Sequence, residues 1–177
     1  VTTGQFNVIV GGNAGDALTT GTRNIVIGTN ALGADTLGSK SVAIGVAALG
    51  DQNFTTATDA FNVAVGHGAA TAVTTGLRNS FVGGLAGDAT TDADDNVAMG
   101  YNALGANTVG SRSVSIGAGS LENQNPATAA NMYNVAVGYN SGNAVSTGIR
   151  NNFYGAESGE ALTTGDDNIA IGYQTLT

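Results

Sequence analysis

The chain has 177 residues, of which 28 are glycine, 10% are charged and none is cysteine, and its formal net charge is −8. This composition excludes a disulfide-stabilised scaffold and a thiolate metal site, and the negative charge argues against nucleic acid and anionic membranes as partners. No apolar run approaches the ~20 residues of a membrane span, so no membrane insertion is expected. Collagen is excluded because glycine does not recur at every third residue, and 42% hydrophobic residues disfavour disorder.

A repeat with a period of about 17 residues runs through the chain. Each copy begins with a run similar to Asn-Val-Ala-Ile-Gly, and the copies start at residues 7, 24, 41, 62, 79, 96, 113, 134, 151 and 168. The third and seventh copies are longer by a four-residue insertion, so that residues 7–78 and 79–150 form two matching super-repeats with 38 identities, followed by a partial one at 151–177. A fixed short period predicts a solenoid, here as a single repeat domain over residues 1–177.

Each repeat begins with a short β-strand. Its second and fourth positions are mostly valine or isoleucine, as in Val42 and Ile44, and this period-two alternation is typical of a strand. Glycine occupies the fifth position in all ten copies, from Gly11 to Gly172, which indicates a sharp turn with positive φ or a close backbone approach. A second short strand and a closing turn such as 19–21 complete the repeat. The sequence therefore predicts an all-β protein, a parallel β-solenoid of about ten 17-residue coils with two longer, 21-residue coils among them.

A narrow core predicts one large side chain in each coil. Coils with leucine at position nine have a polar residue at position twelve, as in Leu32 and Asp35, whereas most coils with a small residue at position nine have valine or leucine at position twelve, as in Ala70 and Val73. Constant packing density explains this exchange. The coil that starts at residue 79 has small residues at both positions, and Phe81 is expected to fill the space.

The third position of each strand is predicted to face other chains. If its valine and isoleucine neighbours are core residues, the side chain between them lies on the opposite face. It is nevertheless apolar in nearly every copy, and such a stripe is too large for a soluble monomer. We expect it to pack against identical chains in a three-fold bundle, or alternatively in a two-fold sheet-on-sheet dimer. The predicted oligomer interface is Ile9, Val26, Ala43, Ala64, Phe81, Ala98, Ala136, Phe153 and Ala170.

Two polar columns, each formed by one position in successive coils, predict further contacts along the stack. Position one is asparagine in eight coils and serine in two, and coils stacked ~4.8 Å apart would let the amides bond to one another. The residue before it includes all five basic residues of the chain, with Asp95 between Arg78 and Arg112. We expect opposite charges to pair on neighbouring coils. A basic stripe that binds a receptor is the alternative.

No catalytic, cofactor-binding or metal site is predicted, and we expect no enzymatic activity. The only histidine, His67, is replaced by Tyr139 in the matching coil of the second super-repeat. The stretch GADTLGSKS, residues 33–41, has glycines at phosphate-loop spacing, but its lysine is one place late and no helix follows. Asp16 and Asp88 share a column but lie four coils apart, too far to share an ion.

Exposed aromatic residues in one turn are candidate receptor contacts. Position six, directly after the turn glycine, is occupied by Tyr101, Tyr139 and Tyr173 as well as by His67. On alternate coils the rings would form a ladder with ~10 Å spacing, and aromatic rings are common anchors for glycans. Packing of each tyrosine against its own turn or a neighbouring chain is the alternative.

The two long coils supply further candidate receptor contacts. Four extra residues cannot enter the stack, so within 50–61 and 122–133 they must leave as loops on one face. Loops on a rigid scaffold often bind ligands. The candidate contacts of the two loops, which differ in sequence, are Phe54, Thr55, Met132 and Tyr133. The alternative is that the loops brace neighbouring chains, with Phe61 and Tyr133 as apolar plugs.

The repeated motif resembles a known family. The runs NIVIG, SVAIG, NVAVG, SVSIG and NIAIG resemble the head repeats of trimeric autotransporter adhesins, the YadA-like heads, and NVAMGYNALGANTVGSR, residues 96–112, is similar to repeat regions of phage tail-fibre proteins. The resemblance implies a left-handed parallel β-roll that forms a homotrimer, displayed extracellularly on a virion or a bacterial cell surface. It also implies that the valines and isoleucines of the motif are core residues and that the alanine between them faces neighbouring chains.

These observations predict a structural and adhesive segment of a trimeric extracellular fibre, which attaches to a host or a surface through a glycan or another receptor. A self-assembling extracellular filament is the alternative, and repeated threonine suggests an ice-binding solenoid as a third. Residues 1–6 match the end of a coil and the last coil stops early, so a segment of a longer fibre is expected.

Overall fold

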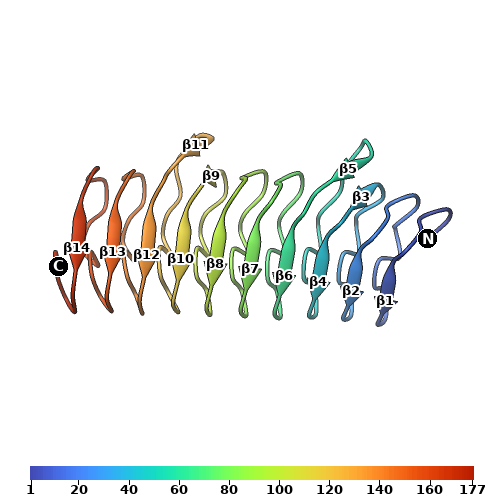
Figure 1. Ribbon diagram of the computed structural model, residues 1–177, viewed down its shortest axis with the longest axis horizontal. Coiled ribbons are helices and arrows are strands. Elements are labelled where there is room, and N and C mark those ends of the chain that lie inside the picture. Colours follow the sequence, from blue (N-terminus) through green and yellow to red (C-terminus); the bar gives the residue numbers. More distant parts are fainter.

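The computed structural model describes all residues 1–177 as a stack of ten coils in a row (Figure 1). Each coil contributes one three-residue strand to a ten-stranded parallel sheet along the whole stack. The strands of this main sheet, in spatial order, are β1 (Val8–Val10), β2 (Ile25–Ile27), β4 (Val42–Ile44), β6 (Val63–Val65), β7 (Ser80–Val82), β8 (Val97–Met99), β10 (Val114–Ile116), β12 (Val135–Val137), β13 (Asn152–Tyr154) and β14 (Ile169–Ile171). The prediction of an all-β parallel solenoid of about ten 17-residue coils is confirmed.

The strands pair in the register that the repeat predicts, with each position opposite the same position of the next coil. Ala43 lies opposite Ala64, for example, and Ala64 opposite Phe81. The two long coils keep this register because their extra residues leave the stack. In Figure 1 both loops project from the same edge, where β5 (Thr58–Asp59) pairs with β3 (Gly38–Ser39) and β11 (Ala130–Asn131) pairs with β9 (Gly110–Ser111).

The turn glycine is required for two reasons at once. Gly66 has a φ of 144°, in the positive region that side chains other than glycine rarely adopt. A Cβ at this position would also collide with the carbonyl oxygen of Gly83 in the next coil. The same arrangement recurs along the column, so both causes suggested by the sequence apply.

The side chains at position three point into the core, and the predicted oligomer interface is therefore wrong. The residues concerned are Ile9, Val26, Ala43, Ala64, Phe81, Ala98, Ala136, Phe153 and Ala170, of which all but the half-buried Ile9 are buried within the chain itself. The valines and isoleucines at positions two and four instead face outward. Strand alternation separates the two sets of side chains but does not say which set is inside. The inward residue is alanine or serine in most coils, whereas in β7 and β13 it is phenylalanine.

Core volume is conserved by exchange between columns, as predicted. Phe81 is fully buried, and its ring occupies the space in which a side chain at Gly87 would lie, 2.7 Å from the ideal Cβ position. Phe153 fills the space beside Gly142 and Gly159 in the same way. A side chain at position three thus replaces the missing one at position nine, which keeps the packing dense.

The asparagine column bonds mainly to the backbone, which corrects the expected amide-to-amide ladder. The side-chain amide of Asn62 donates to the Gly76 carbonyl in the closing turn of its own coil (2.7 Å), and its Oδ1 accepts the backbone N–H of Asn79 in the next coil (2.9 Å). Both contacts recur at Asn24, Asn79, Asn96, Asn134 and Asn151. Each asparagine therefore closes its coil and joins it to the following one.

Serine replaces this asparagine only in the two long coils, where a buried glutamine compensates. Gln52 donates to the Asp35 carboxylate (2.7 Å) and to the Ser41 hydroxyl (3.2 Å), and it accepts from the Asn62 amide (2.8 Å). Asp35 in turn accepts the backbone N–H of Gly38 (2.9 Å). Because each of these buried polar groups has a partner, the core tolerates them next to a loop that leaves the stack.

Candidate functional site

The main sheet presents an apolar face to solvent. We use this name for the side chains at positions two and four of its ten strands, which are all apolar or aromatic except Ser80 and Asn152. Ile25 and Met99 are 40% and 48% exposed, and none of the twenty side chains is fully buried. Ten strands spaced ~4.8 Å apart make this face about 43 Å long. An outward apolar stripe is thus present, but it is formed by positions two and four of each strand and not by the predicted position three.

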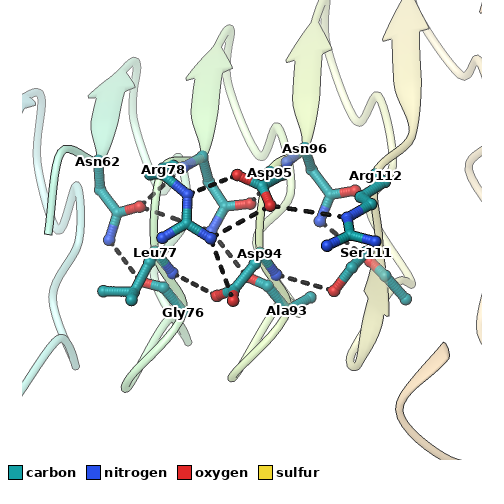
Figure 2. A network of polar contacts seen from close by, with 12 residues as sticks. Asn62, Gly76, Leu77, Arg78, Ala93, Asp94, Asp95, Asn96, Ser111 and Arg112 are labelled. Atoms are coloured by element: carbon teal, nitrogen blue, oxygen red, sulfur yellow. Dashed lines mark hydrogen bonds and ion pairs between the residues drawn. The ribbon is translucent and has the colours of Figure 1, made fainter. Parts of the chain in front are cut away.

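A ladder of charged and aromatic side chains, which we call the charged column, runs beside the sheet. It is formed by the residue before position one. Arg78 Nε donates to Asp95 Oδ1 (2.6 Å), and Arg112 lies 3.8 Å from the other oxygen of the same carboxylate (Figure 2). Arg150 pairs with Asp167 in the same way (2.6 Å). The predicted pairing of opposite charges on neighbouring coils is confirmed.

These ion pairs shift the pKa of both carboxyl groups. The hydrogen bond from Arg78 is the main cause that lowers the pKa of Asp95, and the charges of Arg78 and Arg112 lower it further. The hydrogen bond from Arg150 likewise lowers the pKa of Asp167. The same contacts raise the pKa of Arg78 and Arg150, so each ion pair favours the charged form of both partners.

Aromatic rings in the same column contact Arg23, Lys40 and Arg112, a feature that sequence reasoning missed. The cation of Arg23 lies 5.4 Å from the centre of the Phe6 ring, Lys40 lies 5.0 Å from Phe61, and Arg112 lies 5.9 Å from Tyr133. These distances are in the range of cation–π contacts. The positions of Phe6, Phe61 and Tyr133 in the basic column were the signal that could have predicted this. All five basic residues have partners within the chain, which favours the structural role of the column over a receptor-binding stripe.

The aromatic residues after the turn glycine are exposed. Tyr101, Tyr139 and Tyr173 are 63%, 57% and 67% exposed, and His67 is exposed as well. They are therefore accessible to a ligand. No group of three or more His, Cys, Asp or Glu side chains is placed to hold a metal ion.

The loop candidates divide into exposed and buried residues. Thr55 and Tyr133 are exposed, whereas Phe54 and Met132 are 5% and 0% exposed and cannot contact a receptor, so these two predictions are wrong. Phe54 and Met132 pack beneath the loops because each loop folds back onto the preceding coil through the pairs β3–β5 and β9–β11. Phe61, predicted as an apolar plug, is exposed beside Lys40.

Some threonines of the closing turns form hydrogen bonds within the chain. The hydroxyl groups of Thr19, Thr74 and Thr91 donate to backbone carbonyls of the following coil, at distances of 2.9–3.3 Å. They support the stacking of the turns. Thr20, Thr75 and Thr164, by contrast, are exposed and form no side-chain hydrogen bond.

Comparisons with models of protein families, with characterised proteins and with solved structures found no match to this chain. The class of protein is therefore defined by the fold alone, as a β-solenoid repeat protein. The structure contains no helix, and hence none with the length and apolar character needed to cross a bilayer.

Proposed function

We propose that this solenoid is a structural and attachment segment of a trimeric extracellular fibre, on a virion or a bacterial surface. The observation that supports the proposal is the apolar face, which extends over all ten strands. A contiguous exposed apolar surface of this length is characteristic of an interface between proteins. Three copies that pack these faces around a common axis would remove it from water, and the extended stack would hold attachment residues away from the surface that anchors it.

The resemblance to YadA-like head repeats and phage tail-fibre repeats supports the same proposal, including a left-handed coil. In the proposed trimer the valines and isoleucines of the motif form the contacts between chains, and the alanine between them fills the core of its own chain. The glycan or surface receptor would contact residues outside the apolar face, among which Tyr101, Tyr139 and Tyr173 are accessible.

Sedimentation equilibrium of the purified chain tests the proposal. We expect a stable trimer at micromolar concentration, and a monomer would contradict it. The double variant Val63→Glu with Val135→Glu places charges in the apolar face, and it is expected to yield folded monomers because both side chains point away from the core.

Val46→Glu is the matched control. Val46 is 44% exposed but lies after the turn glycine, outside the apolar face. This variant is expected to remain trimeric. A double variant that keeps the assembly intact would show that chains associate through some other surface.

A further inference from the structure

An open polar groove lies across the first four coils, beyond the turn glycines and outside the apolar face. Its volume is about 360 Å³, and its polar lining consists of Asn13, Asp16, Asn30, Asp51 and Thr71. Its remaining lining residues, among them Gly50, are glycine or alanine and have little or no side chain. The volume is within the range of small-molecule sites, of about 300–1,000 Å³.

In the second super-repeat, a side chain fills the surface equivalent to this groove. Glu122 occupies the position of Gly50, and its carboxylate accepts hydrogen bonds from Asn102 (2.7 Å) and Asn143 (3.0 Å). Asn102 is the counterpart of Asn30, and Asn143 that of Thr71. The groove is present in the first super-repeat, and the equivalent surface around Glu122 has no such groove. The chain therefore contains one open and one filled copy of the same surface.

The polar groups of the open groove retain hydrogen-bonding capacity. The carboxylates of Asp16 and Asp51 form no ion pair and no side-chain hydrogen bond, while in the second copy Glu122 uses both oxygens. Asn13 donates to Asn30 Oδ1 (3.2 Å), which leaves the amide group of Asn30 free to donate. The groove thus offers acceptors and donors side by side.

The charge of the groove limits the class of ligand. Two carboxylates and no basic residue line it, which disfavours phosphate, sulfate or any other anion. A single metal ion is disfavoured too, because no third acidic or histidine side chain lies near these two. Each hydroxyl of a sugar both donates and accepts hydrogen bonds, which matches a lining of carboxylate acceptors and amide donors. The Thr71 hydroxyl donates to the Gly68 carbonyl (2.9 Å) and so adds an acceptor.

We propose that this groove binds one ring of a neutral or amino-bearing saccharide, and that Glu122 closes the equivalent groove of the second super-repeat. The inference rests on the proposed function, because it specifies the receptor class of an attachment fibre. One sugar ring in an open groove makes few contacts and binds weakly, and several copies in an assembly would increase binding by avidity.

Saturation-transfer NMR of the full chain tests the proposal, with galactose, N-acetylglucosamine, glucosamine and N-acetylneuraminic acid as probes in the absence of divalent cations. We expect signals from at least one of the first three sugars and the weakest signals from the anionic N-acetylneuraminic acid. The variant Gly50→Glu copies the filled groove, and it is expected to reduce the signals about tenfold, the effect of about 1.4 kcal/mol in binding.

Gly12→Glu is the matched control, since a Cβ at Gly12 meets no atom within 4 Å and the variant adds the same charge outside the groove. It is expected to bind like the unmodified chain. Absence of signals with all four sugars would overturn the proposal, as would signals that survive Gly50→Glu or that appear only after calcium chloride is added. Sedimentation of each variant distinguishes failure of the sugar-binding proposal from failure of the proposed trimer. A protein that sediments as a trimer but gives no sugar signals would contradict sugar binding in the groove and not the trimeric assembly.

Discussion

At the scale of single residues, the turn glycine is the most constrained position of each coil. We predict that Gly66→Ala lowers the free energy of unfolding by about 3 kcal/mol or more, because alanine is strained at a φ of 144° and its Cβ collides with the Gly83 carbonyl. Urea unfolding followed by circular dichroism measures the loss. Gly12→Ala is the control, since its Cβ meets open space, and its effect is expected to stay within about 0.5 kcal/mol.

Thr90 is the one buried residue whose side-chain polar atom has no hydrogen-bond partner. It occupies the core column in which Val73 and Val145 stand in other coils. We predict that Thr90→Val raises the free energy of unfolding by about 1 kcal/mol, because it replaces the unpaired hydroxyl with a methyl group of similar size. Thr91→Val, which loses a hydrogen bond to the Thr108 carbonyl, should be destabilising instead. Equal effects of the two variants would contradict this explanation.

Some properties of single residues could be predicted from the sequence and others could not. The turn glycine and the exchange between Phe81 and Gly87 could be predicted from the repeat, because both appear when its copies are aligned in columns. The face of the strand was assigned wrongly, because period-two alternation is equally compatible with Ala64 inside or Val63 inside. The distinction depends on the width of the coil, which is a property of the closed structure.

At the scale of elements, the charged column makes stability depend on pH. The pKa of Asp95 is lowered by Arg78, so its ion pair stabilises the fold fully above the unfolded pKa of about 3.9 and loses this effect as the pH falls through the lower native pKa. We predict that Asp95→Asn costs less than about 1 kcal/mol at pH 7, as for other exposed pairs, and that its difference from the unmodified chain disappears toward pH 2.

Chemical unfolding at several pH values measures this dependence. Asp92→Asn serves as the control, because Asp92 is exposed and has no basic partner. A constant difference between the Asp95→Asn variant and the unmodified chain from pH 7 to pH 2 would show that the ion pair does not contribute.

Some features of the two long coils could be predicted from the sequence and others could not. The insertion sites and their exit on one edge followed from the need to preserve the register, and the structure confirms both. The burial of Phe54 and Met132 did not follow, because the loops fold back through two short strand pairs that have no repeat of their own. The co-occurrence of Ser41 with Gln52 has a counterpart in the sequence of the second super-repeat. Only the geometry shows that the Gln52 side chain compensates for the asparagine that Ser41 replaces.

At the scale of the whole molecule, the super-repeat is a unit that can be removed. We predict that deletion of residues 79–150 leaves a folded solenoid, because Arg78 then continues directly into Asn151 with every column in register. Phe153 takes the place of Phe81 above Ala64, and Asp167 takes the place of Asp95 beside Arg78. The β-sheet signal and a cooperative thermal transition should persist, at a lower midpoint because fewer coils stack.

A deletion of residues 79–154 is the matched control. It removes nearly the same mass but also removes β13, and it leaves only residues 155–167 of a 17-residue coil, too few to close that coil. This protein is expected to aggregate or to lose the coils after the junction. Equal folding of the two deletions would mean that register between coils does not determine stability.

The parallel main sheet, with its strands stacked one coil at a time along the axis, also determines how the chain yields to mechanical force. Tension applied between the two termini loads the hydrogen bonds of only the outermost coil, so that rupture proceeds like a zipper from an end. Each 17-residue coil should release roughly 55 Å of contour length and each 21-residue coil roughly 70 Å, from an extended length of about 3.4 Å per residue less one coil spacing. Optical-tweezer traces should therefore show many small steps of two sizes, and a single large rupture would contradict this. Such a chain would extend under sudden load and dissipate energy without detaching at once.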